Sequence, residues 1–188
     1  MTKVFLRKKI AHRIANGHPW IFGNEVEKID GEVNAGDIVE VYYADKKFCG
    51  CGYINPKSQI LDRLLTRKKE TINEDFFYNR ILSAWKYRQQ IGYTENCRLI
   101  FGEADEMPAL IIDKFNDYFV IQTLAYGMEV RKPAIVNALQ KIFNPKGIYE
   151  RNDVPVRELE GLPQQKGFLS TPFDTNIIIN ENGLQFHV

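Results

Sequence analysis

Short segments rich in β-branched and aromatic residues fill the first third of the chain, and they restrict what it can fold into. Residues 3–7 (KVFLR), 38–43 (IVEVYY) and 58–67 (SQILDRLLTR) have the composition of strands. Asp-Gly at 30–31 and Gly-Asp at 36–37 mark turns between such segments. About five short strands in roughly 65 residues predict a small β-barrel.

The pattern changes to that of a single helix over residues 72–91. Asn73 is the expected N-cap and Gly92 the expected end. Apolar residues recur between them at helical spacing: Phe76, Phe77, Ile81, Ala84 and Trp85. We interpret this segment as a helix that connects two domains. The basic residues on it fit a solvated face best, and contact with RNA is the alternative.

Beyond residue 92 strands alternate with one helix. The expected elements are a strand and turn at 97–105, a hairpin at 109–124, a helix at 128–143, a strand at 147–152 and a hairpin at 176–188. We therefore expect an α+β fold with a PUA-like small β-barrel, a connecting helix and a small β-β-α-β-β middle domain. The expected boundaries are 1–71, 72–92 and 93–188.

Charge is divided unevenly between these parts, although the net charge of the chain is only +1. Residues 1–70 carry 13 Lys and Arg against 9 Asp and Glu, and residues 71–188 carry 12 against 15. A first part at +4 and a second part at −3 suggest different tasks for two domains. The basic excess permits nucleic-acid binding without requiring it.

The stretch GHPWIF (residues 17–22) follows a segment that has no acidic residue before Glu25. Trp20 and Phe22 would share one face of a strand, and we expect both to pack mostly inside the barrel. The basic side chains upstream of them would then face phosphates.

Common catalytic signatures are absent from the sequence. It contains no GxGxxG, GxxxxGK[ST], HExxH or GxSxG. An enzyme that uses Glu103 and Asp105 is a weak alternative, because acidic residues are common in turns. Three cysteines argue against a disulfide framework, and Cys49-x-Cys51 alone is a poor zinc site, so we expect no metal. The N-terminus lacks the apolar run of a signal peptide, no stretch has the length of a membrane span, and we expect a cytoplasmic protein.

Two longer stretches are specific: FGEADEMPALIIDKFNDYFVIQ (residues 101–122) and IYERNDVPVRELEGL (residues 148–162). Together with GHPWIF, they resemble the bacterial large-subunit rRNA cytosine-C5 methyltransferases of the RlmI type. In that family a PUA domain comes first, a middle α/β domain follows, and a Rossmann-like S-adenosylmethionine domain comes last. The resemblance implies that this chain is the N-terminal part of such an enzyme.

The resemblance also implies what this part does and lacks. No glycine-rich cofactor loop and no nucleophilic cysteine of cytosine-C5 chemistry is recognisable, so no catalytic residue is expected in this chain. S-adenosylmethionine is expected to bind the full-length parent and not this chain. The expected partners are RNA, large-subunit rRNA above all, and the missing C-terminal methyltransferase domain, with a homodimer left open. The alternative is a stand-alone RNA-binding or ribosome-assembly protein.

Two groups of residues are the expected sites. The RNA-binding group lies in the first domain: Lys8, Lys9, Arg13, His18, Arg63, Arg67 and Lys68, with Lys69 beside them. The second group lies in the charged, proline-containing loop after residue 149: Glu150, Arg151, Asp153 and Arg157. An ordinary solvated loop is one interpretation; contact with the missing domain, or RNA positioning, is the one we favour. On either, loss of Arg151 or Arg157 should barely change the stability of this chain.

Overall fold

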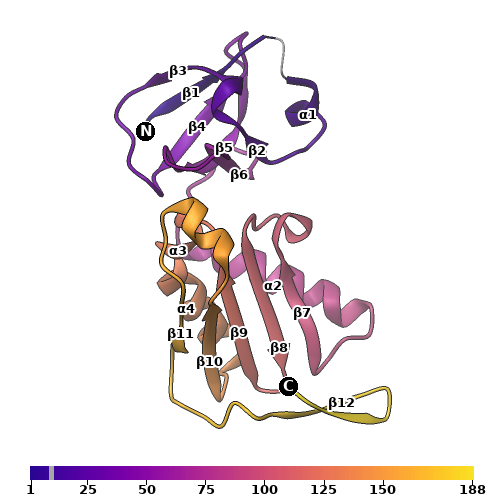
Figure 1. Cartoon of the computed structure of the whole chain (residues 1–188). Coiled ribbons are helices and arrows are strands. Elements are labelled where there is room, and N and C mark those ends of the chain that lie inside the picture. Colours follow the sequence, from indigo (N-terminus) through magenta and orange to yellow (C-terminus); the bar gives the residue numbers. More distant parts are fainter. Residues whose placement is uncertain (9–10) are drawn as a thin grey trace.

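The first domain of the computed structural model is one curled, six-stranded sheet (Figure 1). The structure describes residues 1–8 and 11–188. The strands of this sheet are β1 (Lys3–Leu6), β2 (Trp20–Ile21), β3 (Val26–Asp30), β4 (Ile38–Tyr42), β5 (Phe48–Ile54) and β6 (Asp62–Thr66). Their order is β2-β6-β5-β4-β1-β3, so β2 and β3 form the two edges. Two short helices lie between strands: α1 (Ala11–Ala15) and the 3-10 helix η1 (Gly23–Glu25).

Glycines in β5 allow the close approach of β6. A Cβ atom on Gly52 would lie 2.4 Å from Asp62 Oδ1, and one on Gly50 would lie 2.5 Å from the carbonyl oxygen of Thr66. Strand β6 begins at Asp62, later than the strand predicted over 58–67. Residues 55–58 instead form a turn, in which the Asn55 side chain accepts a hydrogen bond from the backbone N–H of Lys57.

The second domain contains a five-stranded sheet of order β11-β10-β9-β8-β7. Its strands are β7 (Asn96–Phe101), β8 (Leu110–Phe115), β9 (Tyr118–Thr123), β10 (Gly147–Asn152) and β11 (Gln165–Phe168). The helices are α2 (Glu74–Gln90), α3 (Tyr126–Glu129) and α4 (Lys132–Phe143), with 3-10 helices η2 (Gly102–Asp105) and η3 (Pro155–Glu160). A separate hairpin of β12 (Ile178–Glu181) and β13 (Leu184–His187) ends the chain.

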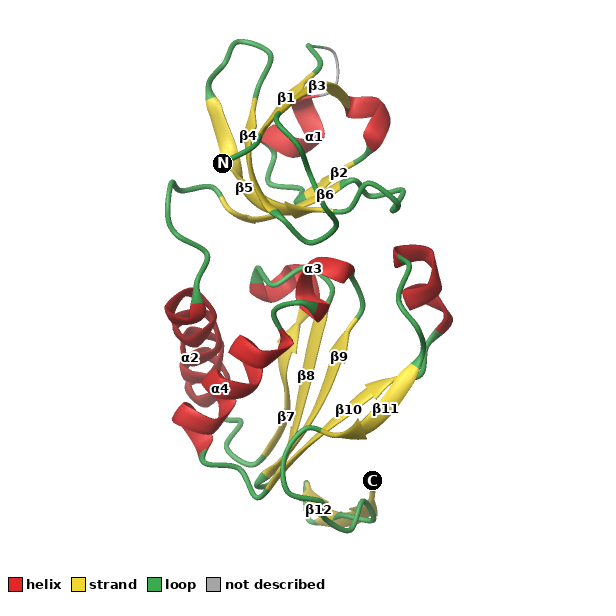
Figure 2. Ribbon diagram, turned by 90° about the vertical axis from the view of Figure 1, so that its left-hand side faces the viewer, coloured by secondary structure: helices red, strands yellow, loops and turns green. Residues whose placement is uncertain are grey.

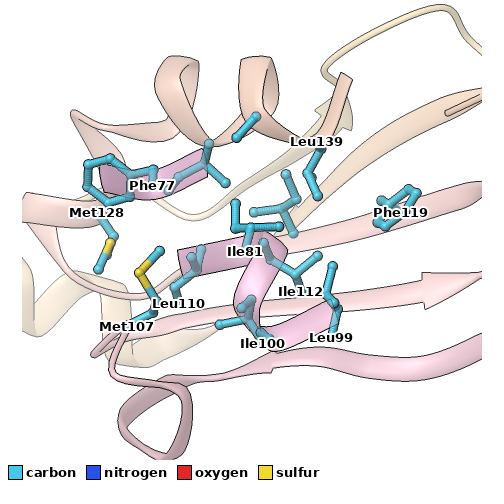
Figure 3. Close-up of a cluster of buried hydrophobic side chains, with 14 of the residues drawn as sticks. Phe77, Ile81, Leu99, Ile100, Met107, Leu110, Ile112, Phe119, Met128 and Leu139 are labelled. Atoms are coloured by element: carbon cyan, nitrogen blue, oxygen red, sulfur yellow. The ribbon is translucent and has the colours of Figure 1, made fainter. Parts of the chain in front are cut away.

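Both long helices pack on the same side of this sheet, as Figure 2 shows. Figure 3 shows the shared core: Phe77 and Ile81 of α2 lie against inward side chains of the strands, such as Ile112. The segment predicted as a connecting helix is therefore a helix, capped by Asn73 as expected, but its apolar face is part of the second core. Hydrophobic periodicity indicates that a face is buried and does not say against which domain.

The predicted β-β-α-β-β pattern has too few elements. Strand β7, at one edge of the sheet, matches the strand expected at 97–105, but β11 adds a strand that was not predicted at the other edge, and α2 adds a second long helix. The sequence did not predict strand β11 (QKGF). This strand lies at an edge of the sheet and buries no residue fully, so it shows no alternating apolar pattern. The predicted helix over 128–143 is two helices, α3 and α4, with Pro133 in the first turn of α4.

No helix within the described part of the chain is both long and apolar enough to cross a membrane.

Candidate nucleic-acid interface

The GHPWIF motif and the stretch at 101–122 touch each other across the domain boundary. Trp20 follows the turn at Pro19, and its indole Nε1–H donates a hydrogen bond of 2.7 Å to Oε1 of Glu103 in η2. Trp20 and Phe22 are only partly buried, whereas Ile21 between them is fully buried in the core of the first domain. The expectation that both aromatic rings pack inside the barrel was wrong, because neither belongs to the core of the first domain, and Phe22 lies beyond the end of β2.

A compact polar cluster holds this turn in place. Arg13 Nη2 lies 2.6 Å from each carboxylate oxygen of Glu25, and Arg13 Nη1 lies 2.7 Å from Nδ1 of His18. The backbone N–H of Trp20 donates to the same His18 nitrogen at 3.2 Å. Since both neighbours are donors, His18 Nδ1 accepts, and the ring proton is on Nε2. Burial and the Arg13 charge lower the pKa of His18, so this histidine is neutral at pH 7.

A cleft of about 610 Å³ lies beside this contact, between the first domain and the α2–η2 region of the second. Its walls carry polar side chains from three segments: Arg67 and Lys68 after β6, Asn79 and Ser83 on α2, and Glu103 and Glu106 around η2. Arg80 also lines it, donates to the carbonyl oxygen of Leu65 at 3.1 Å and forms an ion pair with Glu106. The cleft thus offers both charge signs and neutral hydrogen-bonding groups.

A second set of contacts joins the domains through Arg63, the cross-strand neighbour of Trp20. The carboxylate of Glu160 in η3 accepts hydrogen bonds from Arg63 at 2.8 Å, from Asn55 at 3.0 Å and from the Ser58 hydroxyl. Burial alone would raise the pKa of Glu160, but the Arg63 charge and these donors lower it overall. Tyr53 adds a buried hydrogen bond of 2.8 Å to the carbonyl oxygen of Pro108.

The predicted RNA-binding residues are therefore dispersed. Arg63 is 6% exposed and paired with Glu160, so its assignment to a phosphate-facing surface was wrong. Arg13 and His18 are committed to the cluster around Glu25, and Lys9 lies outside the described residues.

The other basic residues of the predicted RNA-binding group differ in how many partners they have. Arg67 donates to the carbonyl oxygens of Ile14 at 2.9 Å and His18 at 3.1 Å. Lys8 and Lys68 are exposed, and within the described part of the chain neither ammonium group forms an ion pair. The sequence alone cannot distinguish Lys8 and Lys68 from the paired basic residues, because an acidic partner such as Glu160 of Arg63 lies far away in the chain.

The second predicted group divides in the same way, and it is not a single loop, because Glu150 and Arg151 lie in strand β10 and Arg157 lies in η3. Glu150 faces inward and accepts a 2.6 Å ion pair from Lys132. Arg151 is exposed and lies 3.6 Å from Asp153, whereas Arg157 is fully buried and pairs with Glu129 at 3.0 Å. The expectation of an exposed Arg157 was wrong, and a buried side chain cannot itself reach a further domain.

The three thiols have the wrong electrostatic environment for a nucleophile. Cys49 and Cys51 are buried and Cys97 is half-buried, and burial raises the pKa of each thiol, which disfavours the thiolate. No group of three or more His, Cys, Asp or Glu side chains among the described residues is arranged to hold a metal ion.

Comparison with known proteins agrees with the first-domain architecture. Residues 4–67 match the family model of a PUA-like domain. The whole chain is 36% identical over 192 residues to ribosomal RNA large subunit methyltransferase I of Aliivibrio fischeri (strain MJ11). The Vibrio campbellii protein of the same name is 37% identical over 190 residues, 98% of this chain. The chain spans about half the length of these relatives, 48% of each, and the predicted resemblance to RlmI-type enzymes is confirmed.

Solved structures support the same fold. A putative SAM-dependent methyltransferase from Streptococcus mutans superposes on the whole chain with a TM-score of 0.77 at 18% identity, and 48% of its length is covered. A putative methyltransferase complexed with SAH gives the same TM-score and identity over 47% of its length.

Proposed function

We propose that this chain is the RNA-recognition and middle-domain portion of an S-adenosylmethionine-dependent methyltransferase that modifies a cytosine C5 of large-subunit rRNA. The observation that carries the proposal is similarity along the whole chain to rRNA large subunit methyltransferases about twice as long. In this proposal the transfer of the methyl group is performed by a domain outside these 188 residues. Cofactor binding belongs to that domain.

The interdomain cleft and its flanks are the proposed RNA interface. Lys68 lines the cleft and supplies exposed positive charge for phosphates, Lys8 adds exposed positive charge elsewhere on the first domain, and Asn79 and Ser83 offer neutral groups in the cleft suited to base or sugar edges. The ion pair of Arg63 with Glu160 and the Trp20–Glu103 hydrogen bond fix the two walls relative to each other. A site whose walls are already fixed loses less entropy when it binds RNA.

RNA binding by this chain, measured against salt concentration, tests the proposal. Removing both exposed charges in the variant Lys8→Ala/Lys68→Ala should weaken binding to an rRNA fragment and reduce the log–log salt slope by up to about 1.4–1.8. The matched control removes two exposed lysines of α2 and α4, Lys86→Ala/Lys141→Ala, and should leave the slope unchanged. Absence of RNA binding by the wild-type chain, or an unchanged slope in the folded double variant, would contradict the proposed interface.

Cofactor binding is the second arm of the test. Calorimetric titration of the chain with S-adenosylmethionine should give no measurable heat of binding, because in this proposal the cofactor binds to the domain outside these 188 residues. Micromolar binding would show that the cofactor site has been assigned to the wrong domain.

A further inference from the structure

The sheet of the second domain has a side that neither α2 nor α4 covers (Figure 2). Strand register places its outward side chains in two parallel rows. The first row runs Arg98, Asp113, Val120, Tyr149 and Phe168 across all five strands. The second row begins with Phe101, Ile111 and Gln122 and ends with Arg151 and Lys166.

A groove of about 690 Å³ runs over this face. Arg98, Gln122, Tyr149, Arg151 and Lys166 line it, and residues 173–177 form its far wall. Three cations and two carboxylates, Asp113 and Asp153, lie along it, so it has a net charge of +1. Within the described residues Lys166 has no acidic partner.

The two ion pairs in the groove differ, and only Arg151 is left readily available to a ligand. Arg151 is 69% exposed and 3.6 Å from Asp153, a surface pair of little strength. Arg98 is held more firmly, by two hydrogen bonds to Asp113 at 2.8 and 3.1 Å. Arg151 and Lys166 are direct cross-strand neighbours and form the positive end of the second row.

Aromatic rings are exposed on the same face. Phe168 is 41% exposed and packs edge-to-face on Tyr149 at 5.1 Å between ring centroids. Phe101 is 55% exposed at the other edge of the sheet, two residues before Glu103 of the interdomain cleft. The open face therefore adjoins the proposed RNA interface through the end of β7.

We propose that an unpaired RNA strand crosses this open sheet face as a second contact. Its bases stack on Phe168 and Tyr149, and its phosphates meet Arg151 and Lys166. Exposed aromatic rings beside cations on a sheet are suited to single-stranded nucleic acid, because every base has a face that stacks and every nucleotide carries a negative charge. This inference rests on the proposed function in that the ligand is RNA, but it concerns a surface separate from the cleft.

The test uses fluorescence anisotropy with a labelled, unstructured uridine-rich RNA of about ten nucleotides, within the range that a single platform holds. Phe168→Ala should weaken binding at least about fivefold, the lower end of what one stacked base contributes. Arg151→Ala/Lys166→Ala should reduce the salt slope by about 1.4. The control Lys86→Ala/Lys141→Ala, on the helical side of the sheet, should behave as wild type, and melting curves check that each variant folds.

The outcomes separate this inference from the proposed function. If Phe168→Ala and Arg151→Ala/Lys166→Ala bind like wild type while Lys8→Ala/Lys68→Ala loses affinity, the sheet-face contact is refuted and the proposed function stands. If the wild-type chain binds no RNA of either kind, both fail. If the face binds no unpaired RNA but is protected from hydrogen exchange in a longer form of the protein, its partner is a protein domain and the inference is overturned.

Discussion

Replacing Arg157 by alanine should destabilise this chain strongly. The Arg157 side chain is fully buried, and its Nη1 lies 3.0 Å from Oε2 of Glu129. Its Nε donates to the carbonyl oxygen of Pro163 at 2.9 Å, and Nη1 also donates to the carbonyl oxygen of Thr123. Removing one partner of a buried pair typically costs about 3–5 kcal/mol, because the other charge stays buried.

The magnitude should fall at the lower end of that range. Glu129 keeps three other partners in the variant: Lys132 at 2.7 Å, the Thr123 hydroxyl at 2.6 Å and the Gln165 side-chain amide at 3.2 Å. Its charge is therefore only partly uncompensated when Arg157 is lost. We expect a loss of about 3 kcal/mol, which for a chain of this size lowers the melting temperature by roughly 6–12 °C.

Urea and thermal unfolding of Arg157→Ala measure this loss. The matched control is Arg151→Ala, six residues earlier in strand β10, where the side chain is 69% exposed. That variant should stay within about 1 kcal/mol of wild type. Arg157→Lys should be intermediate, because it keeps the charge and loses the forked geometry of the guanidinium. If Arg157→Ala unfolds within about 1 kcal/mol of wild type, the buried pair does not stabilise the fold and our account of the loop is wrong.

Three other substitutions test single interactions. Trp20→Phe removes the exposed hydrogen bond to Glu103 and part of the ring that packs against His18, and should lower stability by about 1 kcal/mol; an unchanged urea midpoint would refute that contact. Glu160→Gln should flatten the pH dependence of stability below pH about 4.3. The Arg63 pair lowers the pKa of Glu160 in the folded chain, so the stability that this carboxylate contributes is complete above its ordinary pKa and is lost as the pH falls through its lower pKa in the folded chain. Burial raises the pKa of Asp62, so its penalty grows as pH rises above the ordinary value; Asp62→Asn should become relatively more stable than wild type between pH 4 and 7, and parallel curves would contradict this.

Local signals in the sequence predicted several turns and a helix cap of the second domain correctly. The hairpin around residues 116–117 and the one around 182–183 form where the Asn-containing turns predicted them, and Asn116 and Asn182 both have positive φ angles, 52° and 51°. Asn73 caps α2 because its side chain accepts the N–H of Phe76. Such features depend on residues a few positions apart, so the sequence alone is sufficient to indicate them.

The burial and pairing of charged residues could not be predicted from such local signals. Arg63 and Arg157 look like surface cations in the sequence, yet both are buried beside carboxylates. The partner of Arg63 is 97 residues away in the chain, and the partner of Trp20 is 83 residues away. Burial of an arginine requires a partner that only the tertiary fold brings close, so composition and spacing favour the surface interpretation wrongly at these positions.

The contacts between the domains explain why distant motifs could act on one ligand. Arg63 pairs with Glu160, Tyr53 donates to Pro108 and Trp20 donates to Glu103, and these three residues are cross-strand neighbours in the first domain. Two further hydrogen bonds join the domains, from Arg80 to the carbonyl oxygen of Leu65 at 3.1 Å and from Arg131 to that of Gly36 at 2.8 Å. Several such contacts fix an orientation, whereas a single one would act as a hinge. An RNA that binds the cleft is then presented at a fixed distance to the open sheet face, and its second contact is intramolecular. In the proposed function, the GHPWIF and GEADEMPAL motifs therefore serve to fix the orientation of the two domains. Neither motif supplies a free cation for phosphate; their side chains connect the two domains whose surfaces carry such cations.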